Sequence, residues 1–151
     1  MKKLILWTSM LALTGCASVQ YGDKTVEAEL KKFSEVPGKT SLYVCRVGGF
    51  VAGGVTSTVL VDGKAIGNLK PKMFAHKIVE PGEHAVQLMN DGIAGSSGIY
   101  KLQTQPNEIA FVWAGVTGGG WGILTVDGFR TTQEGQDCVN EATYSVVNTA
   151  Q

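Results

Sequence analysis

Apolar residues recur with two different periods along this chain. Near the start, Val26, Leu30 and Phe33 lie three or four residues apart, which places their side chains on one face of a helix. Asp23 is a suitable N-cap for that helix, and the Pro-Gly pair at 37–38 ends helical structure. The pattern therefore predicts one short helix that begins at Asp23 and ends at residue 33 or 35.

From residue 40 onward the period changes to two. Residues 41–47 alternate and are rich in β-branched and aromatic side chains, which is typical of a strand. Asp62-Gly63 is the strongest hairpin signal in the chain, and Pro81-Gly82 indicates a second hairpin between the expected strands 72–79 and 83–89. Further strands are expected over the ranges 55–61, 64–69, 99–103, 108–116, 121–126 and 142–148, while 129–132 is interpreted as either a strand or an irregular segment.

Short strands, frequent turn signals and a single early helix together predict the fold class. We expect a mainly β protein, a small antiparallel β-sandwich or open barrel with one short N-terminal helix. The 20 glycines and the charged fraction of only 17% agree with short strands joined by tight turns.

The first sixteen residues follow a pattern of their own. Two lysines at 2–3 precede an apolar run that ends in Leu13-Thr14-Gly15-Cys16. The run is half the length of about 20 residues that spans a bilayer, so it is typical of a signal peptide. Its end resembles a bacterial lipobox, which implies that a lipid is attached to Cys16 and that the chain is cut just before it. The alternative is an ordinary signal peptide with a cysteine nearby by chance.

This resemblance implies an organisation and a location. Residues 1–15 would be the lipoprotein signal peptide, 16–39 a lipid-anchored tether with the short helix, and 40–151 a single β-sandwich domain. Two or three acyl chains on Cys16 would hold the protein to a membrane. Because Ala rather than Asp follows Cys16, the expected location is the cell envelope, on the periplasmic face of the outer membrane.

Cys45 and Cys138 are the cysteines that remain if Cys16 is lipidated. Disulfides persist in exported proteins, and closing a loop of roughly 90 residues stabilises a fold by about 4 kcal/mol on loop-entropy grounds. A disulfide between Cys45 and Cys138 is the favoured interpretation, and two buried free thiols are the alternative.

Charge and motifs exclude several functions. The chain has 13 basic and 13 acidic residues and no basic patch, which argues against a nucleic-acid partner. The glycine clusters match no phosphate-binding fingerprint, and the serines and carboxylates form no recognisable catalytic set. We therefore expect no enzyme activity and no cofactor.

His76 and His84 are the only histidines. Neither has a cysteine or carboxylate at ligand spacing, so no metal site is expected. His84 follows the Pro-Gly turn and is expected to hydrogen-bond to the backbone. Whether the two side chains share a face of the sheet depends on the number of loop residues at that turn. An even number would place them on opposite faces, and a loop of three residues would place both on the same face.

Trp113 and Trp121 flank a triple-glycine loop. Core packing is the favoured interpretation, because Phe111, Trp113 and Gly115 share one face of an apolar strand. A pair of tryptophans on a β-domain could instead stack on sugar rings, and Trp121, at the end of a loop, is the better exposed ligand-binding residue of the two.

A larger resemblance rests on an ordered set of segments. They are Leu42-Tyr43-Val44-Cys45-Arg46, Val59-Leu60-Val61-Asp62-Gly63-Lys64-Ala65-Ile66-Gly67-Asn68-Leu69, Met73-Phe74-Ala75-His76 and Glu80-Pro81-Gly82-Glu83-His84-Ala85-Val86. Their order is similar to that in the bacterial lipoproteins filed as domain-of-unknown-function family 2846, and parts resemble PEGA-type surface β-domains. The likeness covers roughly residues 40–116. It implies a small β-sandwich on an exported lipoprotein and supplies no established activity.

These observations lead to one expected function and two alternatives. We expect a non-enzymatic envelope lipoprotein, in which a β-domain tethered to the membrane through Cys16 contacts a protein partner. One alternative is a module that binds peptidoglycan or another polysaccharide through Trp121 and neighbouring loops. The other, an accessory lipoprotein of a secretion system, rests on analogy of fold.

Overall fold

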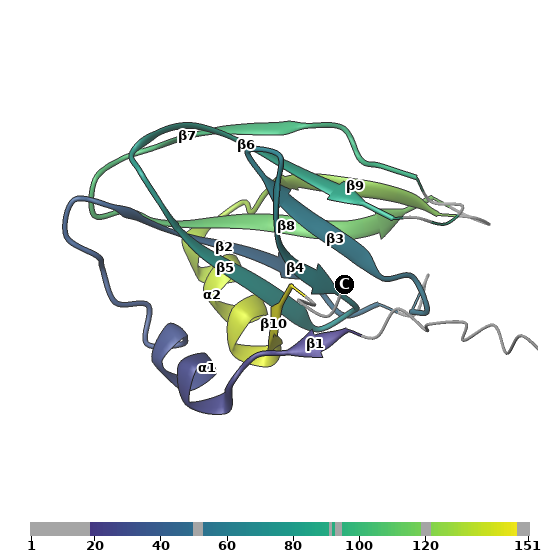
Figure 1. Ribbon diagram of the computed structural model, residues 1–151, viewed down its shortest axis with the longest axis horizontal. Coiled ribbons are helices and arrows are strands. Elements are labelled where there is room, and N and C mark those ends of the chain that lie inside the picture. The colour runs from purple at the N-terminus through teal and green to yellow at the C-terminus, as the bar shows by residue number, and fades with distance from the viewer. Residues whose placement is uncertain (1–18, 50–52, 91, 93–94, 119–121, 148–151) are drawn as a thin grey trace, which may run out of the picture.

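Figure 1 shows the computed structural model of the protein, which describes residues 19–49, 53–90, 92, 95–118 and 122–147. Its elements in chain order are β1 (Gln20–Tyr21), α1 (Lys24–Leu30), β2 (Thr40–Arg46), β3 (Ser57–Val61), β4 (Lys64–Leu69), β5 (Met73–Val79), β6 (Gly82–Met89), β7 (Tyr100–Thr104), β8 (Ile109–Thr117), β9 (Ile123–Gly128), α2 (Thr132–Glu141) and β10 (Thr143–Val146).

The strands form two open sheets, which confirms the prediction of a mainly β fold. The six-stranded sheet has the order β1-β10-β5-β2-β8-β9, and the four-stranded sheet has the order β4-β3-β6-β7. The main core lies between the sheets, because inward side chains of both form one buried cluster. It includes Leu42, Val44, Val59, Val61, Leu69, Ala75, Val86, Leu88, Val112 and Leu124.

Two strand pairs correct the expectation of a purely antiparallel sandwich. In the six-stranded sheet β2 runs parallel to β8 and β10 runs parallel to β5, whereas the four-stranded sheet is antiparallel throughout. The cause is the path of the chain, because neither parallel pair is joined by a tight turn. β8 returns to this sheet from β6 and β7 of the four-stranded sheet, and β10 follows α2, which connects it to β9. Long connections of this kind can place strands side by side in parallel, whereas a tight turn joins antiparallel strands.

The hairpin at Asp62-Gly63 is confirmed. Val61 pairs with Lys64, so the connection between β3 and β4 has two residues. Asp62 has φ +52° and Gly63 has φ +74°, and positive φ at both central residues is the signature of the type I′ turn that suits the twist of a hairpin.

The hairpin expected at Pro81-Gly82 is wrong. β5 belongs to the six-stranded sheet and β6 to the four-stranded sheet, so Glu80 and Pro81 form a corner between layers. Val79 pairs with Thr40, and His84 pairs with Leu102. Neither loop-length alternative for the two histidines therefore applies. A Pro-Gly pair redirects a chain, but it does not specify which sheet receives the next strand.

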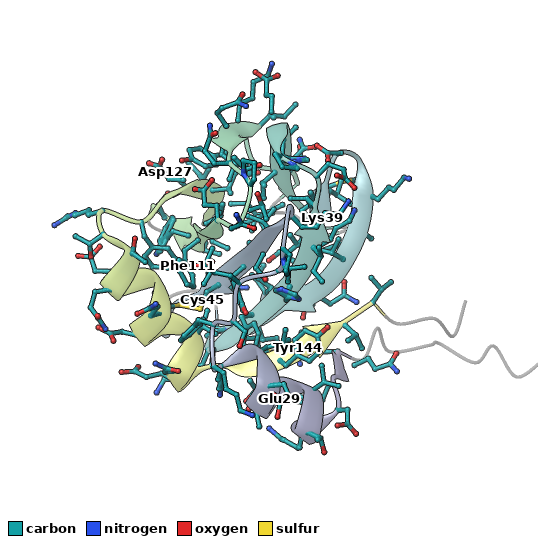
Figure 2. The ribbon with its side chains drawn as sticks, turned by 90° about the vertical axis from the view of Figure 1, so that its left-hand side faces the viewer. Glu29, Lys39, Cys45, Phe111, Asp127 and Tyr144 are labelled. Atoms are coloured by element: carbon teal, nitrogen blue, oxygen red, sulfur yellow. A yellow bond between two sulfur atoms is a disulfide. The ribbon has the colours of Figure 1, made fainter. Side chains whose placement is uncertain are left out.

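A second cluster lies on the opposite side of the six-stranded sheet, under the helices. It contains Tyr43, Cys45, Phe74, Cys138, Val139 and Ala142, with Leu30, Phe33, Phe111, Phe129 and Tyr144 packed against it. Figure 2 shows Phe111 and Cys45 on this side of the sheet. Within the described ranges, the helices and the two sheets thus build three layers.

The helices differ from the sequence prediction in two ways. α1 is capped by Asp23 as expected, but it ends at Leu30 rather than at residue 33 or 35, and Phe33 already has φ +51°. The expectation of a single helix is wrong, because α2 follows β9 and covers residues 133–141, for which the sequence indicated no helix or strand; the segment interpreted as a strand or irregular, 129–132, only leads into its first turn. The Thr131 hydroxyl begins α2 by accepting a hydrogen bond from the amide of Glu134 at 3.2 Å.

A disulfide joins Cys45 on β2 to Cys138 on α2 across 93 residues of sequence. This pair is the one that the sequence favoured. It fixes a mostly polar helix to the buried centre of the six-stranded sheet, and closing a loop of this length stabilises the fold by about 4 kcal/mol.

Candidate functional site

Part of the helix-facing side of the six-stranded sheet lies beyond the cover of α2. Along β8, Phe111 packs against the helix cluster, whereas Trp113, two residues further on, is half-buried and joins neither core cluster. Trp113 lines a groove of about 690 Å³ between α2 and the β8–β9 pair. It also lines an adjoining hollow of about 200 Å³ that includes Val47 and Gly115. Trp113 is therefore the floor shared by two concave surfaces.

Gly115 explains how a tryptophan can lie against the sheet here. A Cβ atom placed on Gly115 would be 2.3 Å from both Cζ2 and Cη2 of the Trp113 indole, closer than any real contact. The ring thus occupies the space above the strand that a side chain at 115 would fill. The glycine is needed for this close approach and not for backbone freedom, because its φ is not in the left-handed region.

Acidic side chains border the groove. Asp127 comes from β9, and α2 contributes Glu134, Asp137 and Glu141, while Arg130 is the single basic residue of the lining. None of these five forms an ion pair within the part of the chain that the structure describes. Figure 2 shows Asp127 above Phe111 and Cys45, at one end of this layer. The groove combines an aromatic floor with a carboxylate rim.

Two of the residues singled out in the sequence lie outside the described residues. They are Trp121, expected to bind a ligand, and Cys16, expected to carry a lipid. Of the two tryptophans that the sequence proposed as ligand-binding, Trp113 lines the groove and so lies where a ligand could reach it.

His84 is held at the corner between the sheets. Its Nδ1 lies 2.8 Å from Asp62 Oδ2, and its Nε2 lies 2.6 Å from the Glu80 carbonyl oxygen, so the predicted backbone hydrogen bond is confirmed. Burial alone would lower the pKa of His84, but the Glu80 carbonyl and the Asp62 carboxylate outweigh it and raise this pKa above 6.5. Both nitrogens face acceptors, and only the imidazolium donates from both.

His76 has a different environment. Its Nε2 lies 3.0 Å from the Ser41 hydroxyl, and its ring centroid is 4.6 Å from that of Tyr43. Burial lowers the pKa of His76 to about 4, so the ring is neutral at physiological pH. Among the described residues, no group of three or more His, Cys, Asp or Glu side chains is arranged to hold a metal ion.

The carboxylates of α2 were not among the candidate site residues predicted from the sequence. The segment 132–141 carries three acidic residues and no basic one, and that imbalance was the available signal. It could not be recognised as one wall of a groove until the helix and its disulfide were placed over the sheet.

The fold and groove define a small two-sheet β-domain with a disulfide-fixed helix. The chain matches no protein-family model. It also matches no curated protein. No helix in the described ranges is long and apolar enough to cross a bilayer.

Proposed function

We propose that this protein is a non-enzymatic lipoprotein of the cell envelope that binds a partner protein through the groove at Trp113. The observation that supports this proposal best is the groove itself, where a half-buried tryptophan lies open beside α2. Aromatic side chains in concave, partly desolvated sites are the usual anchors of protein interfaces.

Two features support the location in the envelope. The lipobox-like segment Leu13–Cys16 ends an apolar run of signal-peptide length. The disulfide between Cys45 and Cys138 is the kind of bond that persists in oxidising compartments. The proposed periplasmic face of the outer membrane rests on Ala17 and on this pair of features.

The order of the strands suits a tethered binding module. β1, which begins four residues after Cys16, is one edge of the six-stranded sheet, and β9 is the other; Figure 1 shows them at opposite sides of the molecule. Six strands spaced about 4.8 Å apart separate the two edges by about 24 Å. The groove borders β8 and β9, so it lies at the edge away from the proposed anchor.

Crosslinking in living cells tests this function. A photoreactive amino acid at Thr125, which lines the groove, should capture a discrete envelope protein, whereas the same residue at the exposed Lys64 on β4 should not. Cys16→Ser should move the protein to the soluble fraction and weaken the crosslink. Equal labelling from both positions, or none from Thr125, would refute the proposed binding surface.

A glycan-binding module is the second candidate, because the Trp113 indole lies against the sheet over Gly115. A flat, half-exposed ring can stack on a sugar ring, and the nearby Thr125 and Asp127 can accept hydrogen bonds from hydroxyl groups. Saturable quenching of tryptophan fluorescence by soluble peptidoglycan fragments, lost in Trp113→Leu, would favour this candidate.

A further inference from the structure

The lining of the groove has a strong charge imbalance, although the formal net charge of the whole chain is zero. The whole sequence has 13 basic and 13 acidic residues. The groove has four carboxylates against one guanidinium, a formal charge of −3. A concave surface of one sign concentrates ions of the other sign and disfavours ligands of its own. Its electrostatics therefore match a cation better than an anionic polymer.

The acidic residues of α2 stand where they reduce the stability of that helix. Asp137 and Glu141 are four residues apart in the last turns of α2, and that end has no basic residue. Like charges at this spacing repel each other, and the C-terminal end of a helix favours cations. Within the described ranges no lysine or arginine pairs with either carboxylate. A bound cation would relieve both effects.

Trp113 adds a second preference to the same groove. The face of an indole ring attracts cations within about 6 Å of its centre, and arginine more often than lysine occupies such positions. The planar guanidinium can stack on an aromatic ring while its edges donate to carboxylates. Trp113 on the floor, with Asp127, Asp137 and Glu141 on the rim, provides both kinds of partner.

We propose that the groove binds a basic segment of the partner protein, with an arginine side chain over Trp113 and its guanidinium among the carboxylates of α2 and β9. This inference rests on the proposed function and specifies the chemistry of the partner. It also predicts that the groove prefers a basic peptide to a saccharide. A neutral saccharide leaves the charge of the carboxylates uncompensated, and an anionic saccharide is repelled.

Fluorescence anisotropy with a labelled, end-blocked Gly-Arg-Gly-Arg-Gly peptide tests the proposal on the full chain in non-ionic detergent micelles. The control peptide has citrulline at both arginine positions, which removes the charge but keeps the shape. We expect the arginine peptide to bind with a Kd that rises with salt. The citrulline peptide should bind at least fivefold more weakly, a loss of about 1 kcal/mol.

Matched variants locate the binding. Asp137→Asn combined with Glu141→Gln should raise the Kd of the arginine peptide about fivefold, a loss of about 1 kcal/mol. Glu29→Gln combined with Glu35→Gln removes the same charge from exposed positions outside the groove lining and should leave the Kd unchanged. Arg130→Gln should lower the Kd, since it removes the one cation of the lining. These positions are exposed, so thermal melts should stay close to the wild type.

The outcomes separate this inference from the proposed function. Equal binding of both peptides, or equal effects of the two double variants, would overturn the arginine site. So would binding of chitotriose in place of the arginine peptide, and that result would favour the glycan candidate. If the partner still crosslinks from Thr125 in the Asp137→Asn/Glu141→Gln protein with undiminished yield, the binding surface stands and its proposed cation chemistry is refuted.

Discussion

Glu27 is the residue whose ionisation should matter most to the stability of this domain. It lies on α1, is only 8% exposed, and its carboxylate accepts hydrogen bonds from the Tyr144 amide at 2.9 Å, from Lys24 at 2.9 Å and from Lys31 at 3.0 Å. Lys31 also donates to the Ala142 carbonyl oxygen at 2.6 Å. One carboxylate thus fastens α1 to β10.

The expected magnitude follows from the pKa of this group. Burial alone would raise the pKa of Glu27, but the Tyr144 amide and the two lysines lower it from 4.5 to about 2. At about 1.36 kcal/mol per pKa unit, this lowering of the pKa corresponds to a contribution to folding stability of at most about 3.4 kcal/mol. Because the Lys24 side chain is 72% exposed and its contribution is screened by solvent, we expect about 2 kcal/mol.

The direction of the pKa shift of Glu27 determines the pH range in which its contribution to stability is lost. The folded state holds the carboxylate ionised more firmly than the unfolded state does, so the stabilisation is fully present above pH 4.5 and declines as the pH falls toward 2. Glu27→Gln should therefore lower the free energy of unfolding by about 2 kcal/mol at pH 7. The difference from the wild type should shrink steadily between pH 4.5 and pH 2.5.

Urea denaturation followed by far-ultraviolet circular dichroism at pH 7, 4.5, 3.5 and 2.5 measures this difference. Glu29→Gln is the matched control on the same helix, because Glu29 forms an exposed pair with Lys32 and should change stability by less than about 0.5 kcal/mol. A Glu27→Gln deficit that is the same at every pH, or no larger than that of Glu29→Gln, would refute the reasoning.

Three further predictions concern the sheet, the corner and the disulfide. Gly115→Ala should displace the Trp113 indole, change its fluorescence and cost about 1–3 kcal/mol in urea unfolding; an unchanged spectrum and stability would contradict the close approach. Asp62→Asn retains a residue suited to positive φ but removes the charge, so it should lower the pKa of His84 in a histidine NMR titration. In the wild type the stability that His84 contributes should be present below pH 6.5 and be lost as the pH rises through its raised pKa. Cys45→Ala combined with Cys138→Ala should destabilise the fold by up to about 4 kcal/mol, seen as a lower thermal midpoint, and a midpoint within error of the wild type would contradict this role.

Local sequence patterns were sufficient for the elements whose causes are local. The Asp62-Gly63 turn needs two residues that tolerate positive φ, and both are adjacent in the chain. Asp23 accepts hydrogen bonds from the amides of Thr25 at 2.7 Å and Val26 at 3.1 Å, so its capping role depends only on its near neighbours. The strand at 40–46 could be recognised in the same way, from its β-forming residues.

The Pro81-Gly82 segment and α2 show where such patterns fail. The same Pro-Gly pair would serve a hairpin, but Val79 is taken up by pairing with Thr40 and His84 by pairing with Leu102. α2 buries only Gly135, Cys138 and Val139, so its apolar stripe is too weak to identify from periodicity. Short helices owe most of their stability to tertiary packing, and this one is held by the bond from Cys138 to β2.

The candidate functional residues also differ in whether the sequence alone could identify them. Trp113 could be selected from the sequence as an aromatic residue worth attention, and the lipobox-like segment that ends at Cys16 is a contiguous signal that needs no fold to be recognised. The groove around Trp113, by contrast, depends on the tertiary structure. α2 covers only part of the sheet, and the path of the chain places the β8–β9 pair next to this helix. Turns and caps are encoded by neighbouring residues. A binding groove instead forms between elements that are distant in the sequence, so its position depends on how those elements pack.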